Sequence, residues 1–149
     1  MDFSLSQEQS LLKDSIDKFI RDETDVERHR RLGKTEAGFD PASWQQFAEL
    51  GWLSVPFAED VGGFGGNAID VMVVAQALGQ GLVREPFLSN VVTCGGFLSR
   101  AGNPAQQQNY IPAIIDGSKQ WAFAFAETNS RYNLASVGCR ADKQGEGYV

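Results

Sequence analysis

The chain has 149 residues, of which 42% are hydrophobic and 21% charged, and its 13 Lys and Arg against 19 Asp and Glu give a net charge of −6. This length suits about one domain, and the composition is that of a globular protein rather than a disordered or fibrous one. The acidic balance and the lack of a basic run exclude nucleic acid and an anionic membrane as partners, because nothing would offset their charge.

The two ends of the chain give further expectations. Residues 1–6 have neither the basic nor the apolar region of a signal peptide, and the apolar stretch 69–83 is interrupted by polar residues such as Asp70, so a cytoplasmic location is expected. Residues 143–147 resemble a hairpin turn, and Tyr148 and Val149 begin a returning strand. Because a domain seldom stops on an unpaired strand, we expect the chain to be a fragment.

Residues 1–119 follow a helical pattern. Ser6 and Gln9 form a capping box that opens a helix over 6–23, and Asp40 before Pro41 opens another that ends at Gly51. Asn67 caps the most apolar helix, which we expect at the centre of the core. The remaining predicted helices cover 25–33, which is short and charged; 88–99, which is weakened by Gly95 and Gly96; and a segment from 103, which Pro112 interrupts or ends.

Other segments of the chain predict loops and strands. Residues 52–57 are typical of a short extended run, and the glycines of 62–66 predict a loop. In residues 121–126 large aromatic residues alternate with Ala, which predicts a strand, and 134–142 also favours an extended conformation. The predicted fold is therefore mainly α, with a helical domain over 1–119 and the start of a truncated β-domain over 120–149.

No local motif indicates chemistry by itself. The loop at 63–66 lacks the strand–turn–helix context of a dinucleotide fingerprint. His29 is expected on the solvated surface with no triad partner, and Cys94 as a small core residue, while the two cysteines form no disulfide framework or metal cluster. Glu127, just after the aromatic segment, is either a functional carboxylate or a polar residue at a strand end. The aromatic segment is either core or the flank of a planar cofactor.

Taken together, four segments resemble the N-terminal part of the acyl-CoA dehydrogenase family. They are residues 3–9 (FSLSQEQ, beginning at Phe3), 47–53 (FAELGWL), 55–65 (VPFAEDVGGFG) and 101–117 (AGNPAQQQNYIPAIIDG). The resemblance implies an N-terminal helical bundle, a β-barrel domain and a C-terminal four-helix bundle in a chain more than twice as long. It also implies FAD-dependent α,β-dehydrogenation of an acyl-CoA thioester in fatty acid or lipid metabolism. The family's catalytic base lies on the C-terminal bundle, so no catalytic residue is assigned here, and no metal ligand is predicted.

The family's flavin motif, aromatic-x-x-Thr-Glu-Pro-x-x-Gly-Ser-Asp, aligns with residues 123–133. The resemblance implies cofactor contacts at Phe123, Phe125, Ala126 and Glu127. Ala126 replaces the Thr, so only backbone contacts to the flavin are expected there.

Thr128 and Arg131 replace the Pro and Gly of the same motif, and Tyr132 and Asn133 replace the Ser-Asp pair near the CoA chain. The resemblance also implies that the helix over 88–99 lines the acyl pocket, with Ser89, Val92, Thr93 and Gly96 facing the acyl chain. The alternative for Gly95 and Gly96 is close packing against a neighbouring helix.

These departures resemble divergent subunits of two-gene acyl-CoA dehydrogenases that act on pimeloyl-CoA or steroid side chains. The implied partners are an acyl-CoA substrate, an electron-transferring flavoprotein or similar acceptor, and a second subunit in a homo- or hetero-oligomer. Two alternatives stay open: a non-catalytic partner subunit, and a flavin monooxygenase or acyl-CoA oxidase of the same fold. The 149 residues alone are expected to bind no flavin and to be inactive.

Overall fold

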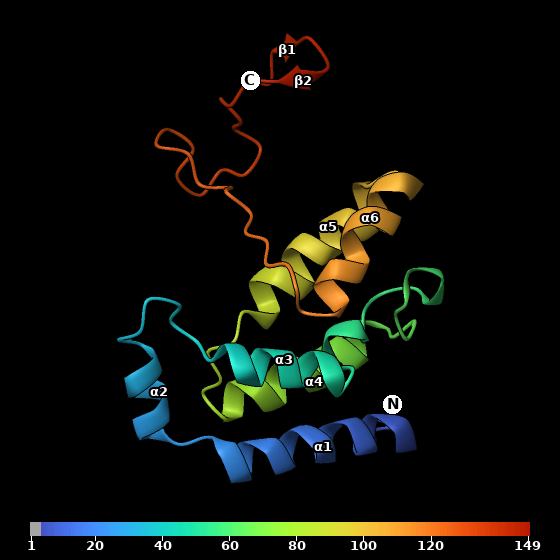
Figure 1. Ribbon diagram of the computed structural model, residues 1–149, viewed down its shortest axis with the longest axis vertical. Coiled ribbons are helices and arrows are strands. Elements are labelled where there is room, and N and C mark those ends of the chain that lie inside the picture. Colours follow the sequence, from blue (N-terminus) through green and yellow to red (C-terminus); the bar gives the residue numbers. More distant parts are fainter. Residues whose placement is uncertain (1–3) are drawn as a thin grey trace.

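A body of packed helices carries an extended C-terminal segment in the computed structural model, which describes residues 4–149 (Figure 1). Phe3, the first residue of the family-like opening, lies outside the described residues. The helices are α1 (Gln7–Glu23), α2 (Val26–Leu32), α3 (Pro41–Glu49), α4 (Ala68–Gln80), α5 (Gly96–Ala101) and α6 (Pro104–Ile115), with 3₁₀ turns η1 (Trp52–Ser54) and η2 (Glu59–Val61) and a π-helix η3 (Phe87–Gly95). A two-stranded antiparallel hairpin, β1 (Lys143–Gln144) and β2 (Gly147–Tyr148), pairs Lys143 with Tyr148. The mainly α fold class is confirmed.

The predicted helix starts are confirmed by their capping contacts. The Ser6 hydroxyl accepts a hydrogen bond from Gln9 N at 3.1 Å while the Gln9 side chain accepts from Ser6 N, and Asn67 and Asp70 form the same box at the start of α4. The Asp40 carboxylate accepts from Ala42 N at 3.0 Å. These bonds satisfy backbone N–H groups that a helix start otherwise leaves without a partner.

The core is built on contact between α1 and α4, which lie side by side (Figure 1), and on a group of aromatic rings. The Phe47 ring lies 5.1 Å from Phe19 and 4.8 Å from Trp52, measured between centroids. Trp44 packs against the same group and donates from its indole N–H to the carbonyl of Gly117 at 3.2 Å. Burying such large rings supplies much of the stabilisation of a domain of this size.

A partly buried polar cluster joins α2 and α3 to the turn before η3. Nη2 of Arg28 donates to the Ser43 hydroxyl at 2.7 Å, to Glu85 Oε1 at 3.1 Å and to Asp40 Oδ2 at 3.2 Å. The Glu85 side chain is fully buried, and its Oε2 has no partner within the described residues. Desolvation raises the pKa of Asp40, but hydrogen bonds from Ala42, Arg28 and Ser43 outweigh it and hold that pKa below its usual value.

Two local predictions in the helical body are wrong. Residues 52–57 are not extended, because η1 turns there and Leu53 is buried among core residues. Pro112 does not end α6, which runs on to Ile115 because Ile111 and Ile114 anchor its last turns in the core. The helix predicted over 88–99 is confirmed: η3 passes directly into α5 at Gly95 and Gly96, where the chain changes from π-helix to α-helix.

The strand predicted over 121–126 is also wrong for the described part of the chain. No strand in residues 4–149 pairs with residues 121–126, and the Phe125 N–H donates to the Phe123 carbonyl at 3.1 Å, which makes a tight turn at Ala124. Residues 134–141 likewise pair with no strand, whereas Asp142 exchanges backbone hydrogen bonds with Val149 at the base of the hairpin. The predicted alternation of large and small side chains is still visible, because the rings of Phe123 and Phe125 lie near each other, with centroids 6.0 Å apart. The hairpin over 143–148 is confirmed. Among the described residues, no helix is both long and apolar enough to cross a membrane.

Candidate functional site

Helix η3 sets the geometry of the candidate site. It is π-helical over nine residues. π-Helical turns are rare in proteins as a whole, and those that occur are often at functional sites. Asn90 lies on it, fully buried, donates from its side-chain amide to the carbonyl of Lys119 at 3.2 Å and accepts from Trp121 N at 2.8 Å. Asn90 therefore holds the start of the aromatic segment, residues 121–125, against the helical body.

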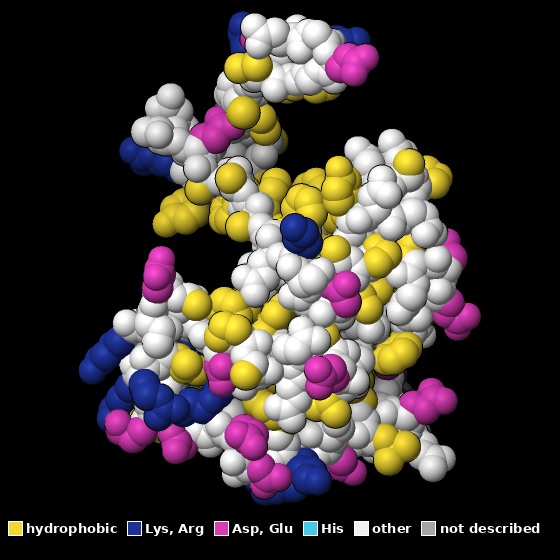
Figure 2. Space-filling view, viewed as in Figure 1, with side chains coloured by type: hydrophobic (Ala, Val, Ile, Leu, Met, Phe, Trp, Pro, Cys, Tyr) yellow, Lys and Arg dark blue, Asp and Glu magenta, His cyan; other side chains and the backbone are white. Residues whose placement is uncertain are grey.

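The aromatic segment runs beside α5 and α6 (Figure 1). The Phe123 ring packs against Phe97 with centroids 4.8 Å apart, and the Trp121 ring packs edge-on against Tyr110 of α6 at 5.2 Å. All four rings remain at least 37% exposed. Figure 2 shows hydrophobic side chains gathered where the C-terminal segment leaves the helices.

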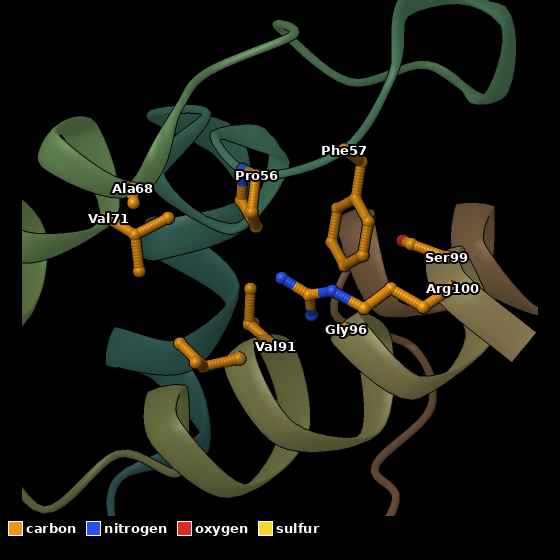
Figure 3. Close-up of a pocket in the computed structure, with 9 residues that line it drawn as sticks. Pro56, Phe57, Ala68, Val71, Val91, Gly96, Ser99 and Arg100 are labelled. Atoms are coloured by element: carbon orange, nitrogen blue, oxygen red, sulfur yellow. The ribbon is translucent and has the colours of Figure 1, made fainter.

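Two hollows flank η3 and α5. The first, which we name the Arg100 hollow, has a volume of about 340 Å³ (Figure 3) and is lined by Pro56, Phe57, Ala68, Val71, Val91, Val92, Gly96, Ser99 and Arg100. The second, the Thr93 hollow, has about 310 Å³ and is lined by Thr93, Gly96, Phe97, Arg100 and Ala101. Both volumes fall at the low end of the range of roughly 300–1,000 Å³ usual for small-molecule sites.

The structure brings three of the four predicted acyl-wall residues to these hollows. Val92 lines the Arg100 hollow, Thr93 lines the Thr93 hollow, and Gly96 lines both. Ser89 is exposed further back on η3, where its hydroxyl donates to the carbonyl of Pro86 at 3.3 Å. Gly95 packs closely, because a Cβ there would lie 2.4 Å from Cζ of Phe57.

The four predicted cofactor residues lie within residues 123–127. Phe123 and Phe125 are 46% and 55% exposed, and the exposed Ala126 N–H donates to no group of residues 4–149. The Glu127 carboxylate instead accepts from Gly138 N at 2.7 Å and Cys139 N at 3.1 Å. Ring faces and a free backbone N–H fit a planar flavin, whereas Glu127 holds its own loop together.

Tyr132 and Asn133, predicted near the CoA chain, lie away from both hollows. Tyr132 is fully exposed, and the Asn133 side chain accepts from Ala135 N at 3.1 Å within a turn. The preceding Arg131 has a φ of 47°, in the left-handed region that favours glycine. It is the residue that aligns with the glycine of the family motif.

Sequence reasoning missed the residues whose roles depend on long-range contacts. Asn90 and Arg28 carry no motif, although a polar residue on an apolar helix was a usable signal for Asn90. His29 is half-buried and lies at the surface, as expected. Its Nδ1 also lies 2.8 Å from the carbonyl oxygen of Leu82, a contact that the sequence did not predict. Cys94 is half-buried, and burial raises the pKa of its thiol, which makes it a poor nucleophile.

Comparisons with known proteins place this arrangement in a class. Residues 6–118 match the model of the acyl-CoA dehydrogenase N-terminal domain. Acyl-CoA dehydrogenase FadE27 of Mycobacterium tuberculosis is 31% identical over 119 residues, which cover 80% of this chain and 32% of that protein. Mitochondrial isovaleryl-CoA dehydrogenase of Pongo abelii is 26% identical over 97% of this chain and 35% of its own length. The chain thus spans about a third of the length of these relatives.

Solved structures agree with the fold. A chain of the ChsE4-ChsE5 complex from Mycobacterium tuberculosis superposes with a TM-score of 0.84 at 29% identity, over 99% of this chain and 39% of that one. An acyl-CoA dehydrogenase complexed with FAD from Bacillus anthracis gives a TM-score of 0.86 at 22% identity, over 98% and 25%. The helical body therefore has the fold of the corresponding part of these proteins. The chain belongs to the acyl-CoA dehydrogenase family, in which residues 6–118 form the N-terminal domain.

Proposed function

We propose that this chain is the N-terminal part of an FAD-dependent acyl-CoA dehydrogenase subunit that oxidises an acyl-CoA thioester between Cα and Cβ. One observation carries the proposal: the Phe97–Phe123 contact brings the expected flavin segment to within one residue of Gly96 on the expected acyl wall. The sequence predicted the flavin segment and the acyl wall separately, without their contact. Residues 120–149 are, on this proposal, the opening of the β-domain.

The residues of this chain would bind and orient rather than transfer protons. Phe123 and Phe125 would supply ring faces, and the Ala126 N–H a hydrogen bond, to the isoalloxazine. Bound FAD supplies the acceptor for the hydride that leaves Cβ. Val92, Thr93 and Gly96 would line the acyl chain and exclude water from it, while Asn90 fixes the aromatic segment at Trp121. The catalytic base is assigned to no described residue.

The test is flavin content and thioester oxidation in the complete protein. We expect stoichiometric FAD, bleaching of the flavin absorbance by an acyl-CoA under anaerobic conditions, and loss of flavin in the double variant Phe123→Ala, Phe125→Ala. Tyr148→Phe, at an exposed hairpin position, is the matched aromatic control. Full flavin retention in the double variant would contradict the assigned cofactor segment. The 149 residues alone are expected to purify without flavin and to show no activity, because their flavin contacts are confined to one segment.

A second candidate is a partner subunit that completes an active one. It is favoured by Ala126 and by Arg131, which stand where the family motif has Thr and a left-handed glycine. Among the structural relatives, ChsE4-ChsE5 is a complex of two named components. Activity of the protein expressed alone would exclude this candidate, and activity that appears only on co-expression with a second dehydrogenase subunit would establish it. In either case an electron-transferring flavoprotein is the proposed acceptor.

A further inference from the structure

We propose that Arg100 binds a carboxylate at the far end of the acyl group, so that the substrate is an ω-carboxyacyl thioester. This inference rests on the proposed function, because it concerns the same acyl wall. It starts from one feature of the Arg100 hollow: a cation that faces apolar side chains. Figure 3 shows the guanidinium turned into the hollow between Pro56 and Val91, beside the ring of Phe57.

Arg100 has no counter-charge within the described residues. Its guanidinium makes no hydrogen bond and no ion pair in residues 4–149. The other residues that line the hollow are uncharged, and the hydroxyl of Ser99 already donates to the carbonyl of Gly95 at 3.0 Å. An arginine side chain is always charged in proteins and presents a planar fork of donors that matches a carboxylate. The donor pair is therefore free for an acceptor that enters the hollow.

The position of Arg100 ties this cation to the acyl wall. Nη1 of Arg100 lies over Gly96, where an added Cβ would approach it to 3.1 Å. Gly96 and Arg100 line both the Arg100 hollow and the Thr93 hollow, so the two spaces meet at these residues. An acyl chain that runs past Thr93 and Gly96 would bring its far end to the guanidinium.

The lining favours a carboxylate over a phosphate. A phosphate carries more charge than a carboxylate and is usually bound by several hydrogen-bond donors. The described lining contains one guanidinium among mostly aliphatic and aromatic side chains. A carboxylate satisfies two of the guanidinium donors at once and leaves the apolar walls in contact with methylene groups. Arg100 itself is exposed, so its guanidinium is accessible to a ligand that lies along the apolar wall.

The experiment compares chain-length-matched thioesters on the complete protein with FAD bound. The pairs are hexanoyl-CoA with adipoyl-CoA and decanoyl-CoA with sebacoyl-CoA, and the measured quantity is the ratio of kcat/KM, ω-carboxy over plain. We expect a ratio above one, lowered about tenfold by Arg100→Gln, as for loss of one charge-assisted hydrogen bond. Arg140→Gln removes another exposed arginine, from the C-terminal segment, and should leave the ratio unchanged. A ratio that is the same in the native protein and Arg100→Gln overturns the inference while the proposed function stands.

A binding measurement tests the carboxylate site at Arg100 independently of catalysis. Calorimetric titration with hexanoate, 1-hexanol and inorganic phosphate should give a preference for hexanoate that Arg100→Gln abolishes and Arg140→Gln keeps. Tighter binding of phosphate than hexanoate, or a preference that survives Arg100→Gln, overturns the carboxylate assignment. If no thioester is oxidised but hexanoate binding depends on Arg100, the proposed function fails and the carboxylate site remains. Equal thermal unfolding midpoints of the two variants exclude a folding defect as the cause.

Discussion

Replacing Asn90 by Ala should release the aromatic segment from the helical body. Asn90 is fully buried, and its side chain makes the two hydrogen bonds, to the carbonyl of Lys119 and from the N–H of Trp121, that fix the entry to that segment. Each such bond contributes about 0.5–1.5 kcal/mol net, so losing both removes roughly 1–3 kcal/mol. That is a large share of a stability of about 5–15 kcal/mol.

The assay is amide hydrogen exchange of the chain together with urea unfolding. In Asn90→Ala the Trp121 amide loses its acceptor, and we expect its exchange to rise by about tenfold, as for the loss of about 1.4 kcal/mol of protection. Asn109→Ala, at an exposed position on α6, is the matched control and should change neither measurement. Asn90→Asp separates the two bonds, because it keeps an acceptor for Trp121 but turns a second oxygen toward the carbonyl of Lys119.

The reasoning would be refuted if Asn90→Ala and Asn109→Ala gave the same Trp121 exchange rate and the same free energy of unfolding. In that case the two short contacts would contribute nothing, and the aromatic segment would be held by the ring contacts alone. A fall in stability without a change at Trp121 would show that the effect of Asn90 is on packing of η3.

Three further predictions test packing, charge and backbone conformation. Gly95→Ala should lower the free energy of unfolding by about 1–3 kcal/mol in urea titrations, because its Cβ would overlap the buried Phe57 ring, and an unchanged midpoint would contradict this. Since the folded pKa of Asp40 lies below its unfolded value of about 3.9, the stabilisation from Asp40 is full above that pH and is lost as the pH falls through the folded pKa. Below about pH 4, the midpoint temperature of thermal unfolding should therefore fall less steeply with pH in Asp40→Asn than in the native chain. Parallel curves would show that the hydrogen bonds from groups such as Arg28 do not lower the pKa of Asp40. Arg131→Gly should slow amide exchange across residues 127–138 by relieving up to about 1 kcal/mol of left-handed strain, whereas faster exchange would show that the flexibility of glycine dominates.

Some elements were decided by a few neighbouring residues and were therefore readable from sequence. The capping pairs at Ser6 and Asn67 fixed the starts of α1 and α4, because a capping side chain bonds to N–H groups within three residues. The hairpin at 143–148 follows from turn chemistry in the same way, with Gly145 at a φ of 65°. The resemblance to the acyl-CoA dehydrogenase family likewise depends only on the order of residues in four segments of the sequence.

Other features depended on partners far along the chain. The extended prediction for 52–57 failed because burial of Trp52 and Leu53 in the core favours a 3₁₀ turn, and the helix-ending prediction at Pro112 failed because core contacts hold the turns around it. The strand expected at 121–126 has the right alternation, but a strand is defined by hydrogen bonds to a neighbour, which residues 4–149 do not provide.

The sequence by itself determined the helix starts, the mainly α class and the family, because these depend on local bonding and on residue pattern. Only the tertiary structure decided that Asn90 holds Trp121, that Phe97 meets Phe123, and that the Arg100 guanidinium turns into an apolar hollow. Each of these contacts joins segments whose meeting depends on how η3 and α5 pack against the rest of the chain. Such packing is set by the whole core, and no window of neighbouring residues contains it.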